Sequence, residues 1–281
     1  MEWTFETAPF TRGPHEAIPH DSGVVLVQSV TTNRGVKAFM AAHEQAAYTA
    51  MRTIGHTKVM NLEAHLTRVA DSWIRMAASK DHANGDQRDP NHDMSIQIRI
   101  QEAVMSALRV ALTSYLSEGA CREGAEARVT VMLPKALMPQ KPYLVQRILM
   151  HIEPHSVAAA SSSRCSVTVH GPPRKFPLTK DSFWIHDRKP LEAAALTPGT
   201  NDLLLSDADG NLHEGLTSNF FVFVRDPDGS PCLITAPLSA VLNGTVLGAI
   251  QKTCERHGIR FRFQFPREAE AETWLGAFIT S

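Results

Sequence analysis

Apolar residues in the first half of the chain recur at two different periods. Residues 62–77 and about 95–117 carry apolar side chains at helical spacing, which predicts two amphipathic helices. Residues 48–65 predict two short strands, because Gly55 and His56 between them are typical of a hairpin turn. Further strands are predicted at residues 24–31, 127–134 and 143–154.

The second half mixes short strands with helices in no regular order. Strands are predicted at residues 165–171, 201–207, 219–224, 231–236 and 259–266. Helices are predicted at residues 181–195 and 244–258, and a short helix followed by the start of a strand at 267–281. Because strand–helix–strand units do not repeat, the pattern favours the α+β fold class over a doubly wound parallel sheet.

Two polar segments interrupt these elements. Residues 81–93 (DHANGDQRDPNHD) predict an exposed loop. The small and polar residues 155–164 (HSVAAASSSR) predict an interdomain linker. We therefore expect an N-terminal α+β domain at residues 1–154 and a C-terminal domain at residues 165–281.

Composition excludes several classes of protein. The chain has 281 residues, with 28 basic and 29 acidic side chains and a net charge of −1, so no overall charge favours nucleic acid or an anionic membrane. The four cysteines are scattered and form no CxxC pair, which favours a reducing compartment. The first residues lack the pattern of a secretory signal, and no apolar run has the length of a membrane span. The prediction is a soluble, cytoplasmic protein.

Common catalytic motifs are missing from the sequence. The chain contains 13 histidines, but none lies at metal-ligand spacing from a cysteine or carboxylate, so no metal is predicted. There is no GxGxxG after a strand, no Walker lysine motif and no GxSxG. The remaining candidates are Arg68, Lys180, Glu214 and Gly244. Each alone has an ordinary structural interpretation: a solvated helix face, a surface charge, the cap of a strand and the start of a helix.

The order of four motifs changes that interpretation. The motifs that follow one another between His65 and Val246 are HLTRVADS, KDSFW, LLLSDADGNLHEGLTSNFFVF and TAPLSAVLNGTV. In this order they resemble the class IV pyridoxal-phosphate enzymes, which include branched-chain aminotransferases, D-amino-acid aminotransferases and aminodeoxychorismate lyases. The similarity extends from about residue 48 to the end of the chain, interrupted by the polar segment 81–93. The EGLTSN block with the DG turn before it is the most specific part of the resemblance.

The separation of lysine and glutamate fits the same family. Lys180 and Glu214 are 34 residues apart (214 − 180), as the resemblance requires for the Schiff-base lysine and the glutamate of EGxxxN. Lys175 and Lys189 lie 39 and 25 residues before Glu214, and both miss that spacing. Lys189 instead matches the DRK that follows the catalytic lysine in aminotransferase-like proteins with a KDSxWxxDRKxLE segment.

The resemblance implies a fold type IV enzyme with pyridoxal 5'-phosphate at the junction of its two domains, and a homodimer. Lys180 would bind the cofactor and move the substrate's α-proton. Glu214 would pair with the pyridine nitrogen and favour its charged form. Tyr48 and Arg52 would bind the substrate. The residues expected to complete the cofactor site are Arg68, Ser218, Asn219, Gly244, Thr245 and Val246.

The resemblance leaves the reaction open. The leading prediction is transamination between an amino acid and a 2-oxo acid, and the alternative is a lyase of the aminodeoxychorismate type. A third possibility is a protein that binds the cofactor without catalysis. The sequence departs from the family pattern in three places: Ile185 stands where many relatives have tyrosine, Leu247 stands where they often have arginine, and the sequence ends at AFITS. The first and the last of these departures motivate the third possibility. From that ending we expect the C-terminal domain to lack the usual last strand.

Overall fold

The structure, a computed structural model, describes residues 2–8, 26–32, 35–78, 90–117, 126–135, 147–155 and 164–281. The chain divides into two compact units. Unit 1 comprises Met1–Ala159 and Lys180–Ser182, and unit 2 comprises Ala160–Thr179 and Phe183–Ser281. The predicted linker at 155–164 falls mostly outside the described residues, so the domain bounds of the sequence analysis stay a prediction.

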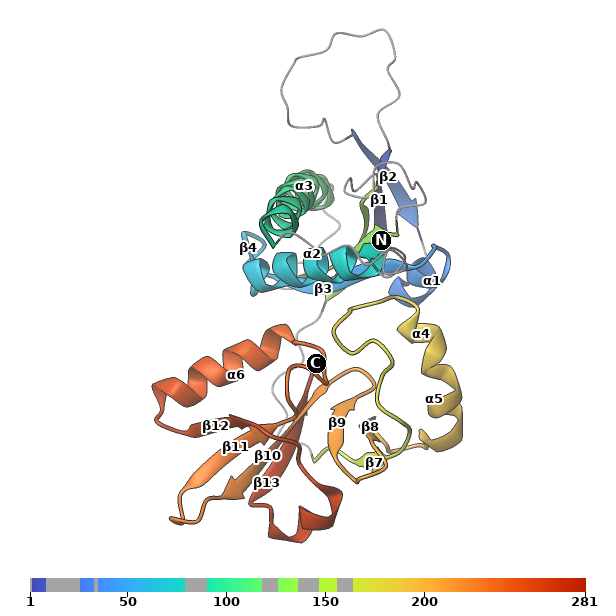
Figure 1. The fold of residues 1–281 in the computed structure, drawn as a ribbon. Helices are drawn as coiled ribbons and strands as arrows, with labels where there is room; N and C mark the ends of the chain where they lie inside the picture. Colours follow the sequence, from blue (N-terminus) through green and yellow to red (C-terminus); the bar gives the residue numbers. More distant parts are fainter. Residues whose placement is uncertain are drawn as a thin grey trace, which may run out of the picture. The chain divides into compact units, whose positions relative to one another are not determined.

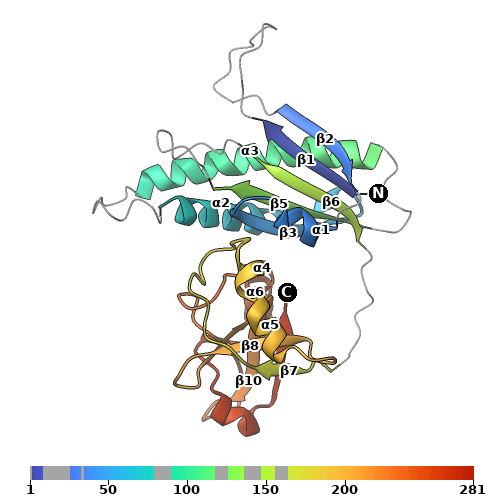
Figure 2. The ribbon, with the colours of Figure 1, turned by 90° about the vertical axis from the view of Figure 1, so that its right-hand side faces the viewer.

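Unit 1 is built on a six-stranded sheet in the order β2-β1-β6-β5-β3-β4 (Figures 1 and 2). All neighbouring strands are antiparallel. The strands are β1 (Glu2–Ala8), β2 (Leu26–Thr32), β3 (Ala46–Ile54), β4 (Lys58–Val59), β5 (Glu126–Pro134) and β6 (Leu149–His155). The turn between β3 and β4 is the predicted hairpin, since Gly55 and His56 both adopt positive φ.

Two amphipathic helices supply the core of unit 1. They are α2 (Leu62–Ala78) and α3 (Pro90–Ser117), and a shorter helix α1 (Val36–Ala41) precedes β3. Trp73 of α2 and Tyr115 of α3 are among the largest fully buried side chains, and they belong to one cluster with Val129 and Val131 of β5. The predicted helical stripe of α2 is therefore confirmed as a face that covers the sheet. The stripe of α3 is confirmed in part, because Ile98, which shares its spacing, is 49% exposed.

Unit 2 is built on a seven-stranded mixed sheet. Its order is β12-β11-β10-β9-β8-β7, and β13 also pairs with β10. The pairs β7–β8 and β11–β12 are parallel, and the other pairs are antiparallel. The strands are β7 (Val167–Val169), β8 (Asp202–Ser206), β9 (Leu212–Gly215), β10 (Asn219–Arg225), β11 (Pro231–Thr235), β12 (Arg260–Phe263) and β13 (Gly276–Thr280).

The helices of unit 2 pack on this sheet through separate apolar clusters. They are α4 (Trp184–Asp187), α5 (Lys189–Ala195) and α6 (Thr245–Arg256), whereas the 3-10 helix η2 (Glu268–Thr273) is exposed. Leu247 of α6 packs with Phe221 and Leu233, while Leu191 of α5 packs against Leu203 and Leu205. Figure 1 shows α6 running beside β10, β11 and β12.

Some predicted bounds are wrong. The exposed loop predicted at 81–93 ends early, because α3 begins at Pro90, and residues 81–89 lie outside the described part. Proline fits a first helical turn, where its missing N–H has no partner to lose. The helix predicted at 181–195 is two short helices, and Asp181 pairs with Ala47 instead.

Two strands escape the sequence pattern. The sequence does not predict β1 or β9, and Glu214 lies inside β9, not directly ahead of the strand at 219–224. With only four residues, β9 is too short to display a period. The predicted strand beginning near Ala277 is confirmed as β13, and the expectation that a further strand is missing stays a prediction.

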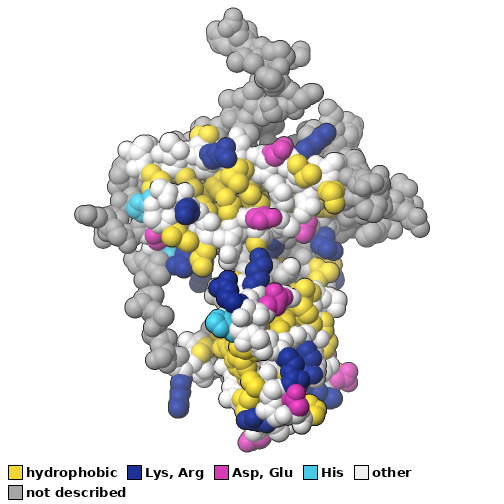
Figure 3. All heavy atoms as spheres, turned by 90° about the vertical axis from the view of Figure 1, so that its left-hand side faces the viewer, with side chains coloured by type: hydrophobic (Ala, Val, Ile, Leu, Met, Phe, Trp, Pro, Cys, Tyr) yellow, Lys and Arg dark blue, Asp and Glu magenta, His cyan; other side chains and the backbone are white. Residues whose placement is uncertain are grey.

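The surface carries charges of both signs. On the face shown in Figure 3, basic and acidic side chains are interspersed with apolar ones. Within the described ranges, no helix is long and apolar enough to cross a membrane.

Candidate active site

Lys180 is fixed to α2 and β3 of unit 1 through its backbone. Its N–H donates to Ser72 Oγ at 3.0 Å, and its carbonyl accepts the N–H of Tyr48 at 2.9 Å. Next to it, Ser182 exchanges hydrogen bonds with the backbone of Ala46. Lys180 Nζ lies 5.1 Å from the centre of the Tyr48 ring. The segment 180–182 thus behaves as a short extension of the sheet that holds the amine beside Tyr48.

The neighbouring lysines have different surroundings. Lys175 and Lys189 are exposed, whereas Lys180 is half-buried. Lys175 Nζ lies over the ring of Phe176 at 5.4 Å, and Phe176 is itself exposed. A half-buried amine on a fixed backbone suits a covalent role better than an amine on the surface, which supports the choice of Lys180.

Arg68 of α2 is held by two neutral side chains. Its Nη2 donates to Thr49 Oγ1 at 2.8 Å and lies 3.4 Å from His65 Nδ1. Thr49 Oγ1 and His65 Nδ1 are 2.7 Å apart. Arg68 Nε is buried without a hydrogen-bond partner, and no carboxylate pairs with this guanidinium among the described residues. A half-buried guanidinium with a buried, unpartnered Nε is suited to bind an anion.

Burial sets the protonation of this cluster. It lowers the pKa of Arg68 to about 10, against an opposing effect of Tyr48, so the guanidinium stays charged at neutral pH. Burial, followed by the charges of Arg68 and Lys180, lowers the pKa of His65 to about 4. His65 is therefore neutral at neutral pH.

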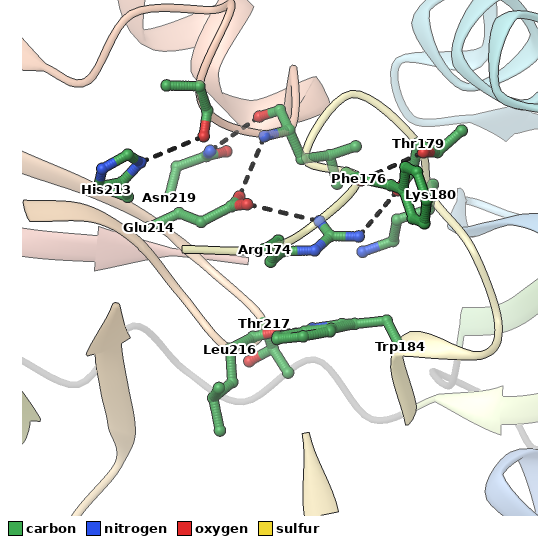
Figure 4. A network of polar contacts seen from close by, with 12 residues as sticks. Arg174, Phe176, Thr179, Lys180, Trp184, His213, Glu214, Leu216, Thr217 and Asn219 are labelled. Atoms are coloured by element: carbon green, nitrogen blue, oxygen red, sulfur yellow. Dashed lines mark hydrogen bonds and ion pairs between the residues drawn. The ribbon is translucent and has the colours of Figure 1, made fainter. Parts of the chain in front are cut away.

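Glu214 is buried in unit 2 and held on both carboxylate oxygens (Figure 4). Its Oε2 accepts the backbone N–H of Leu242 at 3.1 Å, and its Oε1 lies 3.5 Å from Arg174 Nη1. Arg174 also donates to the carbonyl of Thr179 at 2.8 Å and stacks on Trp184, with 4.9 Å between its Cζ and the ring centre. These contacts suit a carboxylate anion in a fixed orientation.

The turn after Glu214 is organised by Asp202. This buried carboxylate accepts the N–H of Leu216 at 3.0 Å and the hydroxyl of Ser218 at 2.7 Å. A Cβ on Gly215 would lie 2.5 Å from Asp202 Oδ2, so only glycine fits the approach. Ser218, predicted as a cofactor residue, therefore has its hydroxyl engaged in holding the turn.

Asn219 connects β10 to the loop before α6. Its Nδ2 donates to the carbonyl of Leu242 at 2.9 Å, and its Oδ1 would lie 2.0 Å from a Cβ on Gly244. Gly244 is the N-cap of α6, so Thr245 and Val246 are its first residues. The first N–H groups of a helix have no partner within it, which suits them to bind an anion.

The predicted substrate residues lie together on β3. Tyr48 faces Lys180 as described, and Arg52 Nε contacts Met60 Sδ at 3.3 Å. Two of the residues that depart from the family pattern, Leu247 and Ile185, lie in helices of unit 2. Leu247 is buried in the core of unit 2, which explains an apolar residue there, and Ile185 is a half-buried residue of α4.

The predicted site residues thus form two groups. Unit 1 brings together Lys180, Tyr48 and Arg68, and unit 2 brings together Glu214, Ser218, Asn219 and Gly244. Sequence reasoning missed Arg174, Asp202, Thr49 and His65. His65 could have been predicted from the sequence as a neighbour of Arg68, since it begins the HLTR motif three residues earlier on the same helix. Among the described residues, no group of histidine, cysteine and carboxylate side chains could hold a metal.

Solved structures share this fold. A fold IV transaminase from Curtobacterium pusillum matches with a TM-score of 0.66 and 16% identity, covering 99% of this chain and 88% of that chain. A hypothetical aminotransferase from Mycobacterium tuberculosis, in its PLP-bound form, matches with 0.62 and 16%, covering 90% and 84%. A 4-amino-4-deoxychorismate lyase from Pseudomonas aeruginosa matches with 0.56 and 15%, covering 89% and 84%. At these identities the similarity establishes the fold alone.

Sequence comparison identifies the family. A search of curated proteins found no match. The profile of the family described as amino-transferase class IV matches residues 46–281. Members of this family depend on pyridoxal phosphate, so the predicted resemblance, the α+β fold class and the cofactor are confirmed. The chain belongs to the class IV aminotransferase family.

Proposed function

We propose that this protein is an aminotransferase that moves an amino group between an amino acid and a 2-oxo acid. The observation that carries the proposal is the buried Glu214 carboxylate, held by the Leu242 amide and the Arg174 guanidinium. A carboxylate fixed in this way is suited to face a protonated ring nitrogen. When bound, pyridoxal phosphate supplies an aldehyde that bonds to amines and a ring that accepts electrons.

The residues present fit that cofactor. The buried Nε of Arg68 lacks a hydrogen-bond partner, as expected of a group that binds phosphate. The close approach of Asn219 to Gly244 favours a loop that leaves the first amides of α6 accessible to an anion. Lys180 supplies an amine on a fixed backbone. The proposal places Arg68 and Lys180 of unit 1 and Glu214 of unit 2 on the same cofactor molecule.

Each residue then has a distinct role. Lys180 bonds the cofactor and afterwards moves a proton at the α-carbon of the substrate. Glu214 holds the proton on the ring nitrogen, and Arg68, Thr245 and Val246 bind the phosphate. Ser218 holds the turn after Glu214, and Asn219 holds the loop before α6. Tyr48 lies against the amine, and Arg52 pairs with the substrate's carboxylate.

Absorbance spectra of the purified protein test this proposal. The protein is loaded with pyridoxal phosphate and titrated separately with L- and D-amino acids, and release of the 2-oxo acid is measured. Spectral change with stoichiometric 2-oxo acid supports the aminotransferase. Release of pyruvate from aminodeoxychorismate supports the lyase instead, and the solved lyase of the same fold makes this the second candidate. Cofactor binding without either reaction supports a non-catalytic protein.

Assembly and location complete the proposal. We propose a homodimer in the cytoplasm with small-molecule substrates and no nucleic-acid or membrane partner. The balanced charge of the chain supports the last part, since 28 basic and 29 acidic residues create no strong field. Light scattering at several protein concentrations measures the oligomeric state, and a mass of one chain at all of them contradicts the homodimer.

A further inference from the structure

Three side chains of unit 1 form a hydrogen-bonded cluster. Thr49 lies on β3, and His65 and Arg68 lie one turn apart on α2, which packs against β3. Thr49 is fully buried, and His65 is 6% exposed. Only Arg68 has a role in the proposed chemistry.

The donors and acceptors of this cluster determine its protons. A guanidinium can only donate, so Thr49 Oγ1 accepts from Arg68 Nη2 across their 2.8 Å contact. His65 Nδ1 lies 2.7 Å from this hydroxyl and 3.4 Å from Arg68 Nη2, which can only donate, so an unprotonated Nδ1 that accepts the hydroxyl proton of Thr49 fits both neighbours. His65 Nδ1 therefore carries no proton and accepts, and the imidazole is neutral with its proton on Nε2.

A charged imidazole would break this arrangement. With a proton on Nδ1, His65 would direct an N–H toward the Thr49 hydroxyl and toward Arg68 Nη2, which lies only 3.4 Å away. The charged groups acting on His65 are Arg68 on its own helix and Lys180 on the segment beside β3, and both are cations. Burial and these two charges keep its pKa near 4, so the accepting form persists at neutral pH.

One corner of the guanidinium is thereby fixed by neutral groups. Held through Nη2, Arg68 keeps its full charge, and its buried Nε remains without a partner among the described residues. A carboxylate in the place of Thr49 would orient the guanidinium equally well but would compensate its charge. The Thr49 hydroxyl, hydrogen-bonded to the neutral imidazole of His65, orients Arg68 without compensating its positive charge, which can then pair with an anionic ligand.

We propose that Thr49 and His65 are positioning residues that orient Arg68 toward the phosphate group of the cofactor, with His65 acting through Thr49. This inference rests on the proposed function, because it takes the anion at Arg68 to be the cofactor's phosphate. It predicts that both residues affect affinity for pyridoxal phosphate and leave affinity for pyridoxal, which lacks the phosphate, unchanged.

The test compares the dissociation constants of pyridoxal phosphate and pyridoxal for each variant, from absorbance titrations of the apoprotein. Thr49→Val removes the acceptor, and we expect about a tenfold to hundredfold loss for pyridoxal phosphate alone. His65→Leu removes the acceptor behind the hydroxyl, and we expect about a threefold to tenfold loss. Thr49→Ser and His65→Asn keep a hydroxyl and an acceptor in place and restore most of the affinity.

Thr67→Val is the matched control. It removes a hydroxyl from the same helix next to Arg68, but that hydroxyl accepts from Gln101 and not from the guanidinium. We expect both dissociation constants to stay unchanged. If Thr49→Val does not fold, the comparison of His65→Leu with His65→Asn tests the proposal. A general loss of stability affects both ligands, so it does not change the ratio of the dissociation constants of pyridoxal phosphate and pyridoxal within one variant.

The outcomes separate the two proposals. If the unaltered protein binds pyridoxal phosphate on Lys180 but Thr49→Val and His65→Leu lose nothing, or lose both ligands equally, the positioning role is wrong and the proposed function stands. If the unaltered protein does not bind pyridoxal phosphate, both proposals are overturned.

Discussion

The two units hold the charged side chains of the candidate site in opposite ways. In unit 2, Glu214 contacts a cation, Arg174, and a backbone amide. In unit 1, Arg68 contacts only a hydroxyl and a neutral imidazole among the described residues, and its Nε is buried without a partner there. One charge is compensated within the protein and the other is not.

This difference indicates what each charge is for. A buried ion without a counter-ion costs several kcal/mol, so proteins rarely keep one unless a ligand supplies the opposite charge. The surroundings of Arg68 are therefore typical of a group that binds an anionic ligand. Glu214 is held in a fixed orientation by Arg174 and the amide of Leu242, which suits a carboxylate that is proposed to pair with a protonated ring nitrogen. The predictions below test this contrast, beginning with the largest effect.

Replacing Lys180 removes the amine that is proposed to bond the cofactor, which Arg68 and Glu214 are proposed to bind. In Lys180→Ala we expect no covalent bond to the cofactor, and no transamination, because neither neighbouring lysine has its spacing and half-buried position. Borohydride reduction followed by peptide mapping measures the bond. Lys175→Ala and Lys189→Ala are the matched controls, since both lysines are exposed, and they should be trapped normally. A cofactor found on either exposed lysine would exclude the assignment.

Replacing Glu214 by glutamine tests the compensated charge. We expect cofactor binding to persist and the rate of transamination to fall about a hundredfold or more, because a neutral amide no longer stabilises charge on the ring nitrogen. Single-turnover kinetics measure the rate. Glu192→Gln is the control, because half-buried Glu192 of α5 pairs with Arg188 and has no proposed role at the cofactor, so this variant should keep the full rate. A rate for Glu214→Gln near that of the control contradicts the role of Glu214.

The contrast between the two charges could be predicted only in part from sequence. The motifs located Arg68, Lys180 and Glu214 because a family pattern depends on residue type and spacing along the chain. The partners of these residues follow no such spacing. Arg174 meets Glu214 across 40 positions, and Thr49 meets His65 across 16. These pairs depend on how strands and helices pack, which local periodicity does not record.

The fold was predictable to a similar extent. Long amphipathic helices such as α2 were found from their apolar stripes, since many residues contribute to one period. The strand β9 escaped because four residues, two of them polar and buried, display no alternation. The segment 180–182 was assigned to a helix from Asp181 onward, although its pairing with β3 determines its conformation. Tertiary contacts override local preference at such short segments.

The neutral state of His65 predicts a pH dependence of stability. Its pKa is about 4 in the folded protein and 6.5 ordinarily. Between these values the unfolded chain binds a proton that the folded chain does not, so the free energy of unfolding falls as pH decreases from about 6.5. The full fall is about 3 kcal/mol, and it levels off below about pH 4.

Urea denaturation of the unaltered protein and of His65→Asn measures this effect. Asparagine does not titrate, so the stability of the variant should fall less steeply with decreasing pH. From about pH 7 to pH 5 we expect the two curves to diverge by about 2 kcal/mol. Parallel curves would mean that His65 titrates normally and that its hydrogen bonds to Thr49 and Arg68 do not require the neutral form.

The last prediction concerns two glycines of the helix that is proposed to bind the phosphate. A Cβ on Gly244 would lie 2.0 Å from Asn219 Oδ1, so Gly244→Ala must displace Asn219 from its hydrogen bond to Leu242. We expect a loss of about 1–3 kcal/mol in stability, together with weaker binding of pyridoxal phosphate.

A Cβ on Gly248, one turn later in α6, would meet no described atom within 4 Å, and Gly248→Ala should raise stability by up to about 1 kcal/mol. Asn219→Ala removes the clashing amide, so Gly244→Ala should cost less in that background than alone. Equal effects of the two glycine substitutions, measured by thermal unfolding with and without cofactor, would contradict the close contact that links β10 to the start of α6.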